Sequence, residues 1–229
     1  MEAVLVLRRK RNTDVARVEA LRAQGLRVWV VPGWSHAATI VALRNLALTL
    51  RPDVLVAHGF SEHIWGRYAG LWAGVPKLVH VEHNSRERYT RWRLAQSRWL
   101  ARRSAALVGV SEGVRDRLIE LGFPAERCVA IPNGVDLERF PAAQLLPMAE
   151  RLPGLVMASR FARQKDQATL IEALALLAQK GLHPPLYFAG LGKKTLLNQA
   201  QGRVRAHGLD SQVHFLGQVS DLPQRLMRS

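Results

Sequence analysis

Short apolar runs alternate with longer amphipathic stretches along the whole chain. Runs of four to six apolar residues bounded by Gly, Pro, Asn or Asp favour buried strands, and apolar residues spaced three or four apart predict helices between them. Strands are predicted at Val4–Leu7, Leu26–Val31, Val54–Ala57, Lys77–Val81, Ala105–Val110, Cys128–Ile131, Leu155–Ala158, Pro185–Ala189 and Gln212–Leu216. Helices are predicted between them, the longest at His36–Leu50 and Gln167–Lys180. This alternation predicts an α/β fold with parallel, doubly wound sheets.

The clearest strand–helix–strand unit begins at Ala105. Ser111 follows the first strand and can cap the next helix, because its hydroxyl can accept a hydrogen bond from an unpaired backbone N–H group. Gly122 ends that helix, and Pro124 prevents its continuation. A second strand and the turn sequence PNGVD follow. The pattern alone therefore predicts a parallel α/β sheet in this region.

Composition and charge narrow the classes of protein. The chain has 229 residues, is 48% hydrophobic and carries a formal net charge of +15, which predicts attraction to phosphates, anionic lipid headgroups or nucleic acid. Cys128 is the only cysteine, so a disulfide framework is excluded and a reducing compartment fits. The opening MEAVLVLRRKR is not typical of a secretory signal, and no apolar run is long enough to span a bilayer. We therefore expect a cytoplasmic protein.

Arginine and aromatic residues gather between residues 86 and 103. On a helix Tyr89, Trp92 and Trp99 share one face, while the arginines spread around it. One interpretation is a basic aromatic surface that docks at an anionic membrane, peripherally at the inner face of the cytoplasmic membrane. The other is a solvated arginine-rich helix whose aromatic face packs on the sheet. The sequence slightly favours the second, and leaves both open.

The strings VSEGVRDRL and IPNGVD, followed by Phe140, resemble the domain junction of retaining glycosyltransferases with the GT-B fold, of the family-four, group 1 type. The resemblance implies two Rossmann-like domains. Residues 1–147 would form the acceptor-side domain, and residues 148–229 would begin the nucleotide-sugar-binding domain. The segment with Pro141, Pro147 and Pro153 is typical of a linker between them.

The same resemblance assigns the donor-binding residues. The string SRFARQKDQATLIEAL resembles the donor-phosphate motif, which implies that Arg160 and Lys165 bind the diphosphate. Both cations lie in a loop between a strand end and a helix start, where ligands of open α/β sheets bind and where an anion is favoured. By the same resemblance Gly190, Gly192 and Gly217 approach the nucleoside. A glycine pair is weak evidence by itself, and a plain turn is the alternative.

His83, at another strand end, resembles the histidine of the acceptor domain that hydrogen-bonds the transferred sugar, and His58 is a weaker candidate. The implied function is transfer of a sugar, with retention, from a UDP-sugar donor to a glycan or lipid-linked acceptor. No metal or other cofactor is expected, because fixed cations can stabilise the leaving diphosphate and no aspartate-based metal motif is present.

Two departures from the family pattern leave other functions open. No glycine-rich loop precedes Val4, and the paired glutamates that bind donor sugar and ribose in the family are absent before Ser229, so the chain resembles an enzyme truncated at both ends. One alternative is therefore a catalytically inactive remnant or a partner-binding protein of the same fold. A nucleic-acid-binding protein is a weaker alternative, motivated by the charge, because the arginines form no recognised nucleic-acid module. We expect no nucleic acid partner.

Overall fold

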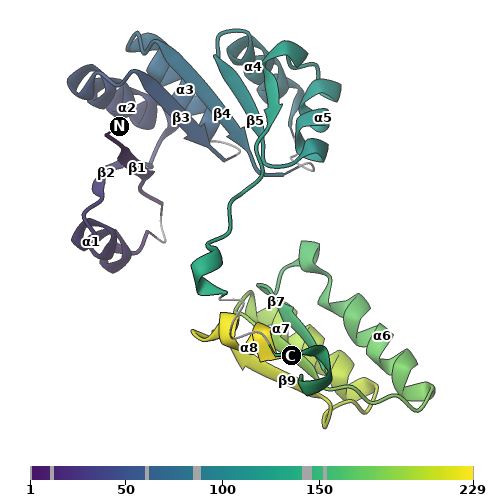
Figure 1. Ribbon diagram of the computed structural model, residues 1–229. Coiled ribbons are helices and arrows are strands. Elements are labelled where there is room, and N and C mark those ends of the chain that lie inside the picture. Colours follow the sequence, from purple (N-terminus) through teal and green to yellow (C-terminus); the bar gives the residue numbers. More distant parts are fainter. Residues whose placement is uncertain are drawn as a thin grey trace. The chain divides into compact units, whose positions relative to one another are not determined.

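The computed structural model describes residues 2–10, 13–59, 62–84, 89–140, 146–151 and 154–228. The chain folds as two compact units, residues 1–134 and 135–229, each an α/β arrangement (Figure 1). The α/β fold class predicted from the sequence is confirmed. The structural division comes earlier in the chain than residue 147, and the assignment of the units to acceptor and donor stays a prediction.

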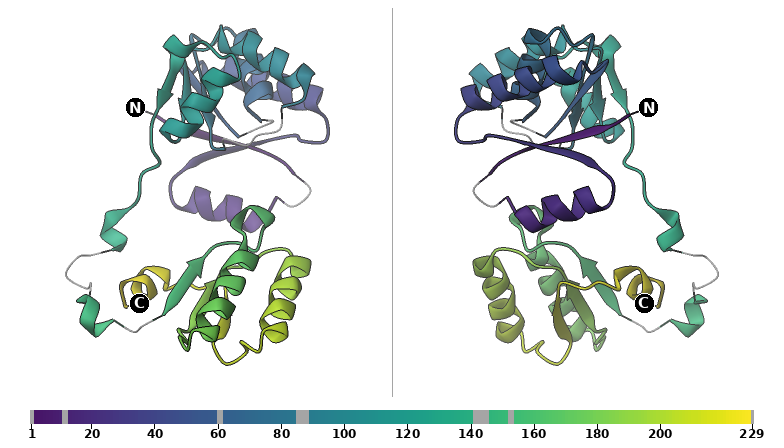
Figure 2. Two further views of the ribbon diagram at one scale, coloured as in Figure 1. Left: turned by 90° about the vertical axis from the view of Figure 1, so that its right-hand side faces the viewer. Right: turned by 90° about the vertical axis from the view of Figure 1, so that its left-hand side faces the viewer.

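The described residues of the first unit form six parallel strands in two sheets. Strands β1 and β2 form one sheet, and the other has the order β3-β4-β5-β6 (Figure 2). The strands are β1 (Val4–Arg8), β2 (Arg27–Val31), β3 (Val54–His58), β4 (Lys77–Glu82), β5 (Ala106–Gly109) and β6 (Cys128–Ala130). The helices are α1 (Val15–Ala23), α2 (His36–Leu50), α3 (Glu62–Trp72), α4 (Arg91–Ala101) and α5 (Glu112–Glu120).

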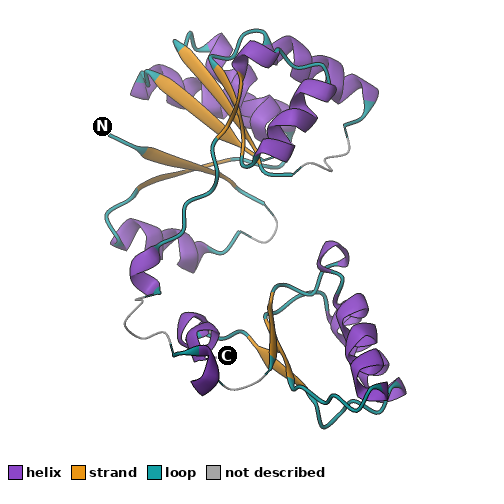
Figure 3. Ribbon diagram, turned by 45° about the vertical axis from the view of Figure 1, so that its right-hand side comes forward, coloured by secondary structure: helices purple, strands orange, loops and turns teal. Residues whose placement is uncertain are grey.

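In the second unit the described strands form one parallel sheet of order β7-β8-β9. Figure 3 shows the strands of both units in orange with their helices in purple. The strands of the second unit are β7 (Leu155–Ala158), β8 (Leu186–Ala189) and β9 (Val213–Gly217). Its helices are α6 (Gln167–Gln179), α7 (Lys194–Ala206) and α8 (Leu222–Arg228). Short 3-10 turns occur at Ala125–Arg127, Leu137–Arg139, Met148–Glu150 and Arg163–Lys165. Every strand predicted from the sequence is present, with ends that differ by a residue or two.

Local chemistry explains where the helices begin and end. The Ser111 hydroxyl accepts from the Val114 N–H at 3.3 Å, as the sequence predicts, and Gly122 follows the helix with φ +78°. Asp166 caps α6 from the left-handed region, φ 52°, and its carboxylate accepts from the Thr169 hydroxyl at 2.8 Å. An Asp in this conformation fixes the sharp entry of the chain into α6.

Each unit has its own apolar core. In the first unit Leu107, Leu118 and Phe123 are buried between β5 and α5. In the second unit Phe161 packs against Phe188 and Phe215, so the loop is anchored to the sheet shortly after β7 ends at Ala158. That anchor fixes the start of the loop that carries the predicted phosphate-binding cations.

The helix predicted over residues 86–103 is shorter in the structure: α4 spans Arg91–Ala101, and Arg86 and Arg88 lie outside the described residues. The predicted shared face is wrong for Tyr89, which precedes α4 and bonds Glu82 instead. The aromatic side chains of α4 do not all pack on the sheet: the side chain of Trp92 is 72% exposed. Trp99 stacks on Tyr68, with 5.9 Å between the ring centroids. The Arg103 guanidinium also lies over the Trp99 ring, 3.8 Å from its centroid, in a cation–π contact. In the part of the chain that the structure describes, no helix combines the length and apolar character that crossing a membrane requires.

Candidate functional site

The loops after β7, β8 and β9 lie at one edge of the second unit, because the three strands are parallel. Backbone hydrogen bonds join these loops. The Gly190 N–H donates to the Gly217 carbonyl at 2.6 Å, and the Ser159 N–H donates to the Ala189 carbonyl at 2.9 Å. The structure therefore brings together the three segments in which the sequence places donor-binding residues.

We call the joined loops after β7, β8 and β9 the cradle. Glycine is required at two positions in it. Gly190 has φ +144°, and a Cβ atom there would lie 2.2 Å from the Ser159 carbonyl oxygen. A Cβ at Gly192 would lie 2.5 Å from the backbone nitrogen and oxygen of Phe161, with which Gly192 forms a parallel bridge. The loops after β7 and β8 can approach this closely only without side chains. These glycines hold the loops together, and contact with a nucleoside stays a prediction.

Gly217 has φ +66°, a conformation in which glycine is unstrained, and the methyl group of Leu191 lies 4.0 Å from where its Cβ would be. The Gly217 carbonyl oxygen accepts a hydrogen bond from the Gly190 N–H, and this bond fixes the backbone of Gly217 against the loop after β8. Gly217 thus lies in the cradle together with Gly190 and Gly192, with which the sequence analysis grouped it.

Arg160 and Lys165 are exposed on the loop between β7 and α6. Neither the guanidinium nor the ammonium group forms an ion pair with a described residue. Arg163 is exposed on the same loop, and Lys193 and Lys194 are exposed where the loop after β8 enters α7. Helix α7 begins there as well, and Lys193, at its N-cap, provides no side-chain cap. Several cations and the positive end of a helix therefore point to an anion, such as a diphosphate, at this edge.

Gln167 is a supporting residue that the sequence reasoning missed. It is buried at the first position of α6, and its amide donates to the Ser159 hydroxyl at 3.2 Å and to the Arg160 carbonyl at 2.9 Å. These bonds fix the backbone that presents the Arg160 side chain. A polar residue at the start of a helix is ordinary, so only the structure shows that this one faces inward.

In the first unit His58 and His83 come from the ends of neighbouring strands β3 and β4. The His58 Nδ1 lies 3.2 Å from the His83 Nε2, and both rings are exposed. Partial burial lowers the pKa of His58, and the nearby His83 lowers it further. Two nitrogens at this distance require that one donates and the other accepts, so the sequence's two separate histidines form one hydrogen-bonded pair.

Beneath His83 lies the buried carboxylate of Glu82. One oxygen accepts from the backbone N–H groups of His83 at 3.0 Å and Asn84 at 3.3 Å, and the other accepts from the Tyr89 hydroxyl at 3.1 Å. Burial raises the pKa of Glu82, and these three hydrogen bonds act against that rise. Glu82 therefore sets the backbone from which His83 projects.

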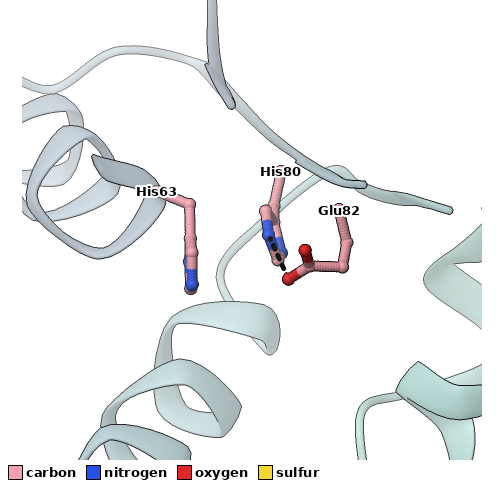
Figure 4. Close-up of side chains that lie close together, drawn as sticks. All are labelled: His63, His80 and Glu82. Atoms are coloured by element: carbon pink, nitrogen blue, oxygen red, sulfur yellow. Dashed lines mark ion pairs between the residues drawn. The ribbon is translucent and has the colours of Figure 1, made fainter. Parts of the chain in front are cut away.

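A second layer of polar side chains is fully buried between α3 and β4. The rings of His63 and His80 stack with their centroids 4.0 Å apart, with Glu82 next to His80 (Figure 4). Burial lowers the pKa of His63 and of His80, so both rings are neutral. The histidines therefore fill the space beneath the Glu82 carboxylate without adding charge.

Arg67, on α3, is wholly buried beside these rings. Its guanidinium nitrogens lie 2.7 Å from the His63 Nδ1, 3.1 Å from the His63 carbonyl oxygen and 3.2 Å from the Ser104 hydroxyl. Burial lowers the pKa of Arg67 to about 10, so the group stays charged at neutral pH. A buried cation held by three neutral acceptors is expensive to desolvate, and removing any partner should be costly.

His63, His80 and Glu82 each offer a ligand atom, and these atoms lie within 4.8 Å of one another. Their surroundings do not suit a metal ion. Because Arg67 can only donate, the His63 Nδ1 must accept, which places the ring proton on Nε2 and leaves no free lone pair on that ring. The adjacent guanidinium would also repel a cation. We therefore interpret the cluster as a structural polar network.

The chain has two α/β units, each built on parallel strands, and one unit has a cationic cradle of strand-end loops. These features are those of a two-domain sugar transferase of the GT-B type. Residues 3–139 match the model of Glycosyltransferase Family 4, and residues 144–229 match that of Glycosyl transferases group 1. The first match alone spans more than half of the chain. The chain belongs to Glycosyltransferase Family 4. The predicted resemblance is confirmed for the family and the GT-B fold, and retention stays a prediction.

Individual relatives agree with this assignment. An Escherichia coli protein named UDP-Gal:alpha-D-GlcNAc-diphosphoundecaprenol alpha-1,3-galactosyltransferase is 27% identical over 83% of this chain and 54% of its own length. The structure of HepE from Anabaena in complex with UDP has a TM-score of 0.77 at 19% identity, and the match covers 98% of this chain and 71% of HepE. A glycosyltransferase from Rickettsia africae has a TM-score of 0.76 at 15% identity, with coverage of 99% and 63%.

The chain spans 54% and 61% of the length of two curated relatives that it matches. These likenesses establish the family and the GT-B fold. They do not test the roles of individual residues, so the assignments of His83, Arg160, Lys165, Gly190, Gly192 and Gly217 stay predictions.

Proposed function

We propose that the chain takes part in transferring a sugar, with retention, from a UDP-sugar to a glycan or lipid-linked acceptor. The observation that carries this proposal is the cradle in the second unit. There glycine backbones fit closely together, and Arg160 and Lys165 are exposed without ion-pair partners among the described residues. The proposal concerns the whole protein's activity, of which this chain supplies the cationic cradle and the histidine pair.

The cations would act on the leaving group. As the bond between the anomeric carbon and the diphosphate oxygen breaks, negative charge builds on the diphosphate. A guanidinium and an ammonium already in place stabilise that charge more in the transition state than in the bound donor, and so lower the barrier. Two fixed cations supply the charge that a metal ion supplies elsewhere, and the proposed reaction therefore needs none.

His83 would hydrogen-bond the sugar that is transferred. Its backbone is held by Glu82 and its ring by His58, so its direction is fixed before any ligand binds. A preorganised donor or acceptor costs less entropy on binding than a mobile one. The proposed role of His58 is to orient the His83 ring.

The named relatives support this choice of donor and acceptor. The Escherichia coli relative is named for a UDP-linked galactose donor and a diphosphoundecaprenol-linked acceptor, and HepE was solved with UDP. A UDP-sugar donor and a lipid-linked glycan acceptor are therefore the first to test here.

Calorimetric titration with UDP and UDP-galactose tests the donor site directly. We expect UDP to bind, and Arg160→Ala and Lys165→Ala each to weaken binding at least about tenfold, because each removes a charged hydrogen-bond donor. Arg203→Ala is the matched control, because Arg203 is an exposed arginine of the same unit that pairs with Glu172. Binding unchanged in Arg160→Ala would refute its role, and no binding by the folded wild type would favour an inactive remnant.

A second proposal concerns a membrane surface. Trp72 on α3 and Trp92 on α4 are 59% and 72% exposed, and Arg91 and Arg93 flank Trp92 in the sequence of α4. Exposed tryptophans beside arginines suit an anionic lipid interface, which fits a lipid-linked acceptor and a cytoplasmic location at the inner face of the membrane. Co-sedimentation should show binding to vesicles with phosphatidylglycerol, lost at high salt and weakened by Trp92→Ala. Equal binding to phosphatidylcholine vesicles would contradict it.

A further inference from the structure

The hydrogen-bonding role of one hydroxyl group in the cradle is fixed by its neighbours. Ser159 follows β7 directly and is half-buried. The side-chain nitrogen of Gln167, a buried residue, lies 3.2 Å from the Ser159 hydroxyl oxygen and 2.9 Å from the Arg160 carbonyl oxygen. The orientation of this amide decides whether the Ser159 hydroxyl accepts or donates.

The Arg160 carbonyl fixes the orientation of the Gln167 amide. A carbonyl oxygen can only accept a hydrogen bond, so the atom of Gln167 that lies 2.9 Å from it must be the NH₂ group. The opposite orientation would bring two oxygens together without a proton between them, which is costly for a buried side chain. The same NH₂ group therefore donates its second hydrogen to Ser159, and the Ser159 hydroxyl accepts.

A hydroxyl that accepts one hydrogen bond still has its own proton to donate. Within the part of the chain that the structure describes, no group accepts from the Ser159 hydroxyl or from the adjacent Arg160 N–H. Two neighbouring donors thus remain available at the end of β7, beside the exposed Arg160 side chain. Such a group of donors suits an anion that brings several acceptor oxygens.

The position of the Ser159 hydroxyl is set before any ligand binds. The Ser159 N–H donates to the Ala189 carbonyl at 2.9 Å, and the Ser159 carbonyl lies close against Gly190, where a side chain would collide with it. Gln167 holds the hydroxyl oxygen from the other side. A donor that is held in this way loses little entropy when a ligand binds.

We infer that the Ser159 hydroxyl donates a hydrogen bond to a diphosphate oxygen of the nucleotide donor. This role rests on the proposed function, in which Arg160 and Lys165 bind the same diphosphate. Ser159 adds a neutral donor to these two cations, and a hydrogen bond to a charged acceptor is stronger than one between neutral groups. Gln167 contributes indirectly, because its bond to the hydroxyl oxygen directs the proton of Ser159 away from the protein.

Calorimetric titration of the full chain with UDP tests the role of Ser159. We expect Ser159→Ala to weaken UDP binding about fivefold to tenfold, because it removes a hydrogen bond to a charged group. Ser159→Thr keeps a hydroxyl and should bind within about twofold of the wild type. Ser211→Ala is the matched control, because Ser211 is an exposed serine that precedes β9 at the opposite edge of the sheet. Hydrogen exchange of the β8 amides checks that each variant is folded.

A double-mutant cycle separates direct contact from an effect through Gln167. If Ser159 contacts the ligand, Ser159→Ala should weaken UDP binding about fivefold in the Gln167→Ala background as well. If the hydroxyl only holds Gln167 in place, Ser159→Ala should have no further effect once the Gln167 amide is absent.

Wild-type affinity for UDP in Ser159→Ala would overturn the inference. So would an effect that disappears in the Gln167→Ala background, or a folded Ser159→Thr protein that binds as weakly as Ser159→Ala. The proposed function fails in a different way: if the folded wild type does not bind UDP, the donor site is refuted and Ser159 has no ligand to contact. UDP binding that Arg160→Ala weakens and Ser159→Ala does not would refute the role of Ser159 alone.

Discussion

The loop after β4 in the first unit rests on a cluster of buried polar side chains. The loop after β7 in the second unit rests mainly on close backbone contacts with neighbouring loops, with one buried polar side chain, Gln167, beneath it. Glu82, His80 and Arg67 are buried in the core beneath His83. Glu82 accepts from the backbone N–H of His83, and Arg67 donates to the His63 ring. Arg160 lies in the loop after β7, which approaches the loop after β8 closely because Gly190 and Gly192 have no side chains, and Arg160 itself is exposed to solvent. The same strand-end position can thus be built from side chains, at a cost in desolvation, or from backbone, which leaves the side chains available for a ligand.

This comparison separates stability from binding. Changes beneath His83 should destabilise the first unit, whereas changes to the exposed cations of the second unit should affect ligand affinity alone. All six tryptophans lie before residue 135, so tryptophan fluorescence reports the unfolding of the first unit specifically.

The largest effect is expected for Arg67→Leu. It leaves a buried histidine ring and the Ser104 hydroxyl without their partner, and should lower the free energy of unfolding of the first unit by about 4 kcal/mol. Urea unfolding followed by tryptophan fluorescence measures this. Arg98→Leu, at an exposed arginine of the same unit that bonds only the Leu121 carbonyl, is the control and should cost about 1 kcal/mol. If Arg67→Leu and Arg98→Leu lowered the free energy of unfolding equally, buried Arg67 would contribute no more to stability than a surface arginine.

Gly190→Ala should be the next most damaging change, at about 3 kcal/mol, because its Cβ would collide with the Ser159 carbonyl oxygen. Hydrogen exchange of β8 amides reports the stability of the second unit, and UDP affinity should fall with it. Gly202→Ala on α7, where a Cβ meets nothing within 4 Å, should instead stabilise the unit by about 0.5–1 kcal/mol. A Gly190→Ala protein with wild-type exchange and affinity would show that the loops do not depend on close contact.

The stability of the first unit should depend on pH through His63 and His80. Burial lowers both pKa values in the folded chain, whereas in the unfolded chain each ring takes up a proton near its ordinary pKa. The unfolded state therefore binds more protons below that pKa, and stability falls as the pH falls. Between about pH 7.5 and pH 5.5 the free energy of unfolding should drop by about 2 kcal/mol.

Fluorescence-monitored urea unfolding at both pH values measures this drop. The drop should be smaller in His80→Gln, in which His63 remains to take up a proton on unfolding. The raised pKa of Glu82 acts in the opposite direction and reduces the drop. A flat profile in the wild type would mean that the rings are not kept neutral by burial.

The smallest effect is expected for Gln167→Ala, which removes the two hydrogen bonds that hold the Arg160 backbone. It should cost about 1 kcal/mol of stability in the second unit and weaken UDP binding severalfold. Gln179→Ala, an exposed position at the other end of α6, should change neither. Wild-type UDP affinity in Gln167→Ala would show that Arg160 needs no such support.

The sequence predicts what depends on local pattern. Strand positions, the Ser111 cap and the glycine-dependent loops follow from residue types at short spacing, and the family follows from the strings around Arg160 and the junction. The sequence does not predict that His58 and His83 form a pair, because their contact depends on strand order. Nor does it predict that Arg67 and Gln167 point inward, since exposed arginine and glutamine have the same pattern on an amphipathic helix.

The most direct test of the account follows the backbone amides of the whole chain by nuclear magnetic resonance during titration with UDP. The account predicts the largest shifts at residues 159–166, 190–194 and 217, with the pattern lost in Arg160→Ala and kept in Arg203→Ala. Shifts confined to the first unit, or an identical pattern in Arg160→Ala, would contradict the assignment of the diphosphate to the cradle of the second unit.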